Sequence, residues 1–163
     1  MKSVEFCLIR DTAYINSLSI TTMKLGMSTG PFIKIKWTGI NDEEKLKLIL
    51  EAFAGCKEDV PIPDNPEKYS KLSLKPFGFS NWKIFARTGL HCMIEYDIEQ
   101  YHFIPLIYSK KDNALYASGS TESIVASATA EKFIGTLVKT LEKIPELTEM
   151  YYHKEAADNE ELE

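Results

Sequence analysis

Short runs of hydrophobic residues alternate with polar turns at the start of the chain. Branched and aromatic residues fill 4–9 and 13–18, and the polar segment 10–12 separates them, which predicts a β-hairpin. A turn-rich segment with glycine and proline follows at 26–31. The next residues, 32–37, alternate strictly between apolar and polar and predict a third strand. The face of this strand that we expect in the core carries Ile33, Ile35 and Trp37.

The spacing of apolar residues changes to that of an amphipathic helix in two longer segments. Asn41 and Glu44 form an N-terminal capping signature for the first helix, which ends at Gly55. Thr129 caps the second helix, and we expect Pro145 to stop it. The two apolar faces, which we expect to pack on a sheet, consist of Leu46, Ile49, Leu50 and Phe53, and of Phe133, Leu137, Leu141 and Ile144.

A short aromatic helix and a run of strands lie between these two helices. Ser80 is a capping residue at the start of the short helix, and Gly89 suits a left-handed C-terminal cap. Its buried face is expected to contain Trp82, Phe85 and Ala86. Pro105 has no backbone N–H to donate to a neighbouring strand, so its strand is expected at a sheet edge or at a bulge. The strands are predicted at 90–96, 101–108, 114–118 and 122–126.

These elements predict an α+β fold, in which an antiparallel central sheet, a hairpin plus a meander, packs against amphipathic helices. The segment 57–79 interrupts the pattern with four of the seven prolines. Long irregular segments in small domains are usually functional, so this one is a candidate partner-facing surface. The alternative is a packed segment that its leucines and Phe77 hold against the core.

The charge of the chain is concentrated at its end. The formal net charge is −5, but 153–163 alone holds five acids against Lys154, and the rest of the chain is nearly neutral. With 163 residues and 44% hydrophobic residues, the chain is long enough for one well-buried domain. We expect a single α+β domain over 1–152 and an acidic, disordered tail over 153–163.

The cysteines and the hydropathy pattern bear on location. Three cysteines at wide spacings form neither a disulfide framework nor a zinc motif, which favours a reducing compartment. No 18-residue apolar run occurs, and Arg10 and Asp11 interrupt the apolar N-terminus. We therefore expect a soluble, cytoplasmic protein that binds no membrane.

The sequence contains no complete catalytic, metal-binding or nucleotide-binding motif. The closest cluster of residue types that bind metals consists of His91, Cys92 and His102. A hairpin about Ile98 and Glu99 would put His102 opposite Tyr96 and His91 opposite Ile107. The two histidines would then lie too far apart along the strands to bind one metal ion. A nucleophile would need Cys92 with His102 and Glu95, whereas a buried structural cysteine is the commoner case. Gly30 is followed by proline, unlike a phosphate loop, and the basic residues are too few and too balanced for direct nucleic-acid binding. We expect no enzyme activity, no cofactor and no metal.

The order of elements and several landmark residues resemble the CdiI-type immunity proteins of contact-dependent growth inhibition (CDI) systems. The resemblance covers about 32–144. It rests on the strand and the 41–55 helix that follows it, the Ser80-Asn-Trp-Lys-Ile-Phe85 segment, the strand run with Ile104-Pro105 and the closing helix. It implies a cytoplasmic protein that binds and neutralises a cognate toxin, the CdiA C-terminal region, often a nuclease, in a tight one-to-one complex. The proline-rich segment and the acidic tail depart from the family pattern.

An inhibitor of this kind needs acidic groups complementary to a basic substrate channel. The turn region with Glu95, Asp97, Glu99 and Tyr101 combines acids with an aromatic residue beside an expected edge, and we expect it to face the toxin. Two alternatives remain from other classes. One is a small hydrolase that uses Cys92 or His91, and the other is an adaptor that self-associates through the strand edge at Pro105.

Overall fold

The computed structural model describes residues 1–65 and 74–161. Within these residues the chain forms seven strands and three α-helices. The strands are β1 (Lys2–Ile9), β2 (Thr12–Ile20), β3 (Gly26–Lys36), β4 (Leu90–Asp97), β5 (Gln100–Ser109), β6 (Ala114–Ala117) and β7 (Glu122–Val125). The helices are α1 (Asp42–Ala54), α3 (Trp82–Thr88) and α4 (Ala130–Glu161), with 3-10 turns η1 (Trp37–Gly39) and η2 (Lys75–Phe77).

The strands form one antiparallel sheet in the order β3-β2-β1-β4-β5-β6, with β7 also paired to β5. The predicted N-terminal hairpin and the predicted meander are both present, and β1 joins them by pairing with β4. The fold class is α+β, as predicted. The hairpin β4–β5 turns at Ile98 and Glu99, whose φ values of 45° and 60° are those of a tight two-residue loop.

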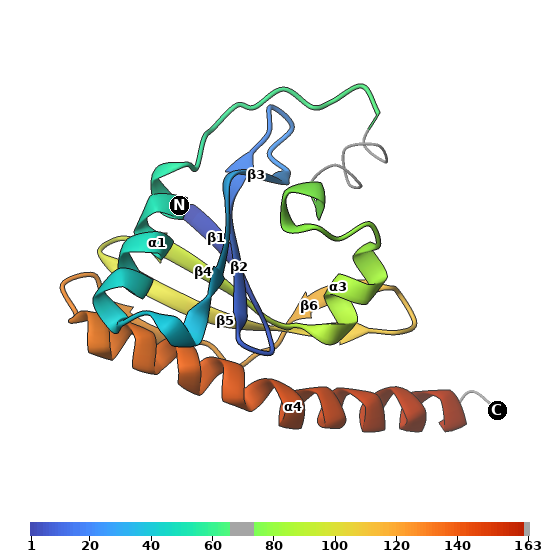
Figure 1. Cartoon of the computed structure of the whole chain (residues 1–163). Coiled ribbons are helices and arrows are strands. Elements are labelled where there is room, and N and C mark those ends of the chain that lie inside the picture. The colour runs from blue at the N-terminus through green and yellow to red at the C-terminus, as the bar shows by residue number, and fades with distance from the viewer. Residues whose placement is uncertain (66–73, 162–163) are drawn as a thin grey trace.

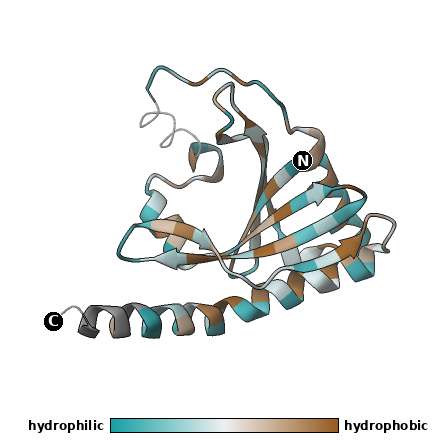
Figure 2. Ribbon diagram, turned by 180° about the vertical axis from the view of Figure 1, so that it is seen from behind, coloured by the Kyte–Doolittle hydropathy of each residue, from teal (hydrophilic) through white to brown (hydrophobic). Residues whose placement is uncertain are grey.

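The main core lies between the sheet and two helices. Helices α1 and α4 pack on one face of the sheet, while α3 lies on the opposite side (Figure 1). The capping prediction for α1 is confirmed, because Asn41 Oδ1 accepts the Glu44 N–H at 2.9 Å. The alternation of hydrophilic and hydrophobic residues along the strands is visible in Figure 2. The buried side chains of this core include Val4, Phe6, Ile15, Trp37, Ile49, Ile94, Phe103, Phe133 and Leu137.

A second, smaller core forms on the other face of the sheet. It consists of Cys7, Tyr14, Leu74, Phe77 and Phe85. Two of these residues belong to the proline-rich segment, so the described end of that segment packs on the sheet. The residues 66–73, with Tyr69 and Leu72, lie outside the described residues.

Helix α4 departs from the prediction that Pro145 would stop it. The helix continues through Pro145 to Glu161 and extends past the sheet (Figure 1). Proline removes one N–H donor from the helix, but Leu141 and Ile144 are buried against the core at this turn and hold it in place. The backbone of 153–161, where the charge pattern predicts a disordered tail, belongs to this helix.

Three further local predictions are wrong. Strand β3 begins at Gly26, within the segment predicted as a turn. Asn81, instead of Ser80, caps α3, and Gly89 has φ −92°, which is not left-handed. Position 89 has no room for a side chain, because a Cβ there would lie 2.9 Å from His91 Nε2.

Pro105 does not mark a sheet edge or a bulge. Strand β5 lies inside the sheet, between β4 on one side and β6 and β7 on the other. The Pro105 carbonyl accepts the Ser118 N–H at 3.0 Å. The nitrogen of Pro105 therefore also faces the side of β5 on which β6 and β7 pair, at the point between the β6 pairing and the β7 pairing. The missing donor therefore falls at a gap in the pairing.

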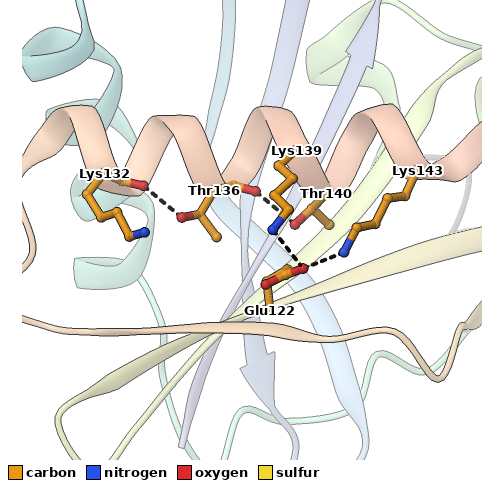
Figure 3. Close-up of polar contacts among 6 residues, drawn as sticks. All are labelled: Glu122, Lys132, Thr136, Lys139, Thr140 and Lys143. Carbon is orange, nitrogen blue, oxygen red and sulfur yellow. Dashed lines mark hydrogen bonds and ion pairs between the residues drawn. The ribbon is translucent and has the colours of Figure 1, made fainter.

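Strand β7 is attached to α4 by charge as well as by packing. Glu122 accepts a hydrogen bond from Lys143 and lies 3.5 Å from Lys139 Nζ (Figure 3). The bond from Lys143 and the charges of both lysines lower the pKa of Glu122. Thr136 and Thr140 satisfy their own hydroxyls by donating to carbonyls one turn back in the helix. The contacts of Glu122 with Lys139 and Lys143 hold β7 against α4.

Candidate functional site

The face of the sheet opposite α1 and α4 is covered only in part, and we call it the open face. Strand register places Glu5, Glu95 and Asp97 on this face. Glu5 pairs with Met93 and Ser3 pairs with Glu95, so the two glutamates are diagonal neighbours on β1 and β4. Both are half-buried, whereas Asp97 is exposed. The open face therefore presents an acidic strip along its centre.

The structure divides the four residues predicted to face the toxin. Glu95 and Asp97 lie on the open face, and Glu99 lies in the turn, where its carbonyl accepts the Ala126 N–H. Tyr101 points to the other side, with its ring 5.0 Å from Phe133 and 5.6 Å from Phe53. Burial raises the pKa of the Tyr101 hydroxyl. The predicted edge beside this hairpin is covered, because β7 pairs with β5 there.

The register of the hairpin also corrects the positions of the histidines. His102 pairs with Glu95 and His91 with Leu106, one residue away from the predicted partners. Cys92 lies on the helix side of the sheet, opposite to His102 and Glu95, so these three residues do not assemble. Burial raises the pKa of the Cys92 thiol to about 12, which disfavours the thiolate. Within residues 1–65 and 74–161, no group of three metal-ligating side chains gathers.

His91 belongs to the smaller core. Its Nε2 lies 3.0 Å from the Phe85 carbonyl oxygen and 3.7 Å from Cys7 Sγ. Burial lowers the pKa of His91 from 6.5 to about 4, which outweighs the opposing effect of the backbone hydrogen bonds. Burial also raises the pKa of Cys7. Cys7 and His91 thus form a neutral contact within the sheet, and the bond from His91 to the Phe85 carbonyl anchors α3 to it.

The buried neutral histidine predicts that the protein loses stability in acid. The unfolded chain takes up the His91 proton near pH 6.5, whereas the folded chain takes it up only near pH 4, so stability falls as pH decreases through this window. We expect the free energy of unfolding to drop by about 2 kcal/mol from this group between pH 7.5 and 5. Urea unfolding at the two pH values measures it. His91→Leu should flatten the slope and His102→Gln should not; a wild-type stability independent of pH would contradict the prediction.

A groove extends from the acidic strip toward α3. It encloses about 410 Å³ and lies between the β2–β3 connection, residues 62–63 and the aromatic side chains of η2 and α3. Glu5 and Asn16 come from the adjacent strands β1 and β2 and line it together with Ser28 of β3. Its apolar lining includes Leu25, Met27, Ile62, Phe77, Trp82 and Phe85.

No local pattern in the sequence predicts this groove. Its lining comes from five separated segments, and only the fold brings them together. One signal was present, because Glu5 is the single charged residue in the apolar run 4–9. A charge within a strand that is otherwise apolar indicates a position where the sheet is not fully covered.

The comparison with solved structures finds proteins similar to this chain, whereas the two comparisons of its sequence find none. No protein-family model matches the sequence, and no curated protein does. A protein of unknown function from Neisseria meningitidis, NMB0488, superposes with a TM-score of 0.67 at 12% identity, over 88% of this chain and 94% of that one. A chain of the CdiA-CT/CdiI toxin and immunity complex from Yersinia pseudotuberculosis superposes with a TM-score of 0.68 at 9% identity, over 88% and 97%.

This chain has a CdiI-like fold. The resemblance to CdiI-type proteins, inferred from landmark residues, is therefore confirmed at the level of the fold. The superposition covers most of this chain and nearly all of the other one, so the likeness is one of the overall fold. Within the described part of this chain, no helix is both long and apolar enough to cross a membrane.

Proposed function

We propose that this chain is an immunity protein that binds and neutralises the C-terminal toxin domain of a CdiA-type protein, as a one-to-one complex in the cytoplasm. The observation that carries the proposal is the shared fold with a chain of a CdiA-CT/CdiI complex, at a TM-score of 0.68 and over 97% of that chain. Such a protein acts by occupying a surface of its partner. It needs a rigid scaffold and a complementary face more than reactive side chains.

The open face supplies the complementary surface in this proposal. Glu95, Asp97 and Glu99 place three negative charges at one end of the β4–β5 hairpin, and Tyr101 is half-buried at the same end. We propose that this end of the hairpin faces the toxin, with the three acids on its surface and Tyr101 supporting it from the helix side. Acids at this position would pair with the basic channel through which a nuclease holds its substrate.

The two alternatives from other classes lose their structural support. A hydrolase would need Cys92 beside a histidine and a carboxylate, but Cys92 lies on the opposite side of the sheet from His102 and Glu95. An adaptor that pairs through an edge at Pro105 would need that strand to be free, but β5 is an interior strand.

Co-expression tests the proposal directly. The chain would be produced together with the C-terminal domain encoded immediately upstream of its gene, and growth and co-purification would be measured. We expect the domain alone to arrest growth, the chain to restore it, and the two to elute as a one-to-one complex. A domain that is toxic in the presence of the chain and does not co-purify with it would refute the immunity role.

Charge removal at the hairpin then tests the proposed surface. The triple variant Glu95→Ala, Asp97→Ala, Glu99→Ala should reduce the association rate at low ionic strength about tenfold or more, because it removes three charges from the encounter surface. The matched control is Glu142→Ala, Glu146→Ala, Glu149→Ala, which removes three exposed acids from α4. Equal association rates for the two triple variants would place the toxin elsewhere.

A further inference from the structure

Glu5 is a charged residue in the lining of the groove, and no described residue carries an opposite charge in contact with it. It is the one charged residue among the described residues that line the groove. Asn16 Nδ2 and Ser28 Oγ each donate a hydrogen bond to Glu5 Oε2 at 2.9 Å, which fixes the orientation of the carboxylate. No ion pair joins Glu5 to a lysine or an arginine among the described residues, whose four ion pairs involve other acids.

The second feature of the groove is its aromatic wall. Trp82 lines the same groove and is 40% exposed, although it belongs to a helix that packs on the smaller core. The adjacent Phe85 ring lies 6.1 Å from it, so the indole has a packed support behind it. Leu25, Met27 and Ile62 provide apolar surface along the remaining sides. An exposed indole beside a fixed carboxylate is a favourable environment for a cation.

We infer that this groove recognises an arginine side chain of the partner, held by the Glu5 carboxylate and packed against Trp82. The inference rests on the proposed function for the identity of the partner, and it names the chemistry of the contact. A guanidinium pairs with a carboxylate in a fixed geometry and also stacks on aromatic rings, which an ammonium does less well. The aliphatic part of the same side chain suits the apolar walls.

A metal ion fits the groove less well than an arginine does. Glu5 is a single carboxylate, and calcium or magnesium would need several oxygen ligands around it. The described residues hold no cluster of metal-ligating groups at this place. A neutral apolar ligand would bury the carboxylate without neutralising it, which is costly.

The groove can be tested without any toxin. The isotope-labelled full chain would be titrated with acetyl-Leu-Arg-Leu-amide and, separately, with the citrulline analogue, which has nearly the same shape and no charge. We expect the arginine peptide at millimolar concentration to shift the backbone amide signals of Glu5, Asn16 and Ser28, and the citrulline peptide to bind at least about tenfold more weakly. Equal effects of the two peptides, or no effect of the arginine peptide, would overturn the inference.

Glu5→Gln is the decisive variant, because its amide oxygen still accepts the bonds from Asn16 and Ser28 while the charge is lost. It should abolish the preference for the arginine peptide and weaken binding of the upstream-encoded toxin domain about 30-fold or more. Glu43→Gln removes one exposed acid from α1 and should change toxin binding by less than about threefold. An unchanged urea midpoint checks the folding of both variants.

The two arms separate the inference from the proposed function. If the wild-type chain binds the toxin domain and Glu5→Gln binds it equally well, the inference is wrong and the immunity role stands. If the wild-type chain prefers the arginine peptide but does not bind the toxin domain, the immunity role is wrong and the arginine specificity of the groove stands.

Discussion

Replacing Phe133 by alanine is expected to lower the free energy of unfolding by about 3–5 kcal/mol. Phe133 is 2% exposed and packs α4 against strand β5. Its ring meets the rings of Tyr101 and Phe103 edge-on, each at a centroid distance of 5.0 Å. Truncation removes both aromatic contacts and leaves a cavity between two rigid layers, which do not collapse to fill it. Urea unfolding would show a lower midpoint at an unchanged slope.

The control lies five residues further along the same helix. Val138 is 40% exposed, so Val138→Ala should change stability by about 0.5 kcal/mol or less. Equal midpoints for Phe133→Ala and the wild type would show that α4 does not depend on this contact. Because Tyr101 packs on the same ring, the variant should also loosen the β4–β5 hairpin, which provides the proposed toxin-facing acids.

The local elements could be predicted because their signals lie within a few residues. The capping pair of Asn41 and Glu44 and the alternation in β3 both depend on adjacent side chains, and both are confirmed. The tight turn at Ile98 and Glu99 was also expected, although an isoleucine with φ 45° is an unusual choice. The hairpin and the meander follow from the same local patterns.

The predictions that failed depend on contacts distant in sequence. Pro145 stops an isolated helix, but here the buried Leu141 and Ile144 hold the helix on the core just before it, and the Tyr152 hydroxyl donates to the Tyr108 carbonyl after it. Pro105 reads as an edge residue until β6 and β7 are seen to share the same neighbour, β5. The error in the β4–β5 hairpin is of another kind: the turn at Ile98 and Glu99 places Glu95 opposite His102, and the predicted partners were displaced by one residue from that register, which changes the face of every side chain in the pairing. The displaced register would put Tyr101 opposite Asp97 on the open face, whereas Tyr101 pairs with Tyr96 on the other face.

The groove could not be predicted from the sequence, because it also depends on contacts between residues distant in sequence. Its lining joins β1, β2 and β3 to residues of the segment 62–85, and the fold determines which of these side chains meet. The apolar residues of this groove have the same sequence pattern as core residues. What separates them from the core is the single carboxylate of Glu5 and the partial exposure of Trp82, and both become informative only when their neighbours are known.

Replacing Gly55 by alanine is expected to lower the free energy of unfolding by about 3 kcal/mol. The backbone of Gly55, with φ −80° and ψ −10°, suits any residue, so the cost comes from space. A Cβ at this position would lie 2.8 Å from the Gly30 carbonyl oxygen and 2.6 Å from Ser17 Oγ, and it would also collide with the Pro31 ring. The end of α1 would have to move away from β2 and β3. Ser17, which is fully buried, would then lose its hydrogen bond to the Ala52 carbonyl.

The matched substitution at Gly135 should have the opposite sign. A Cβ there meets no atom within 4 Å, and the residue is exposed inside α4, so Gly135→Ala should stabilise the protein by about 0.5–1 kcal/mol through helix propensity. In a chain of this size the two changes correspond to a Tm about 6–12 °C lower and about 1–4 °C higher, respectively. A thermal unfolding scan of both variants measures the contrast. If Gly55→Ala melted at the wild-type temperature, the close approach of α1 to the β2–β3 pair would not be a requirement of this fold.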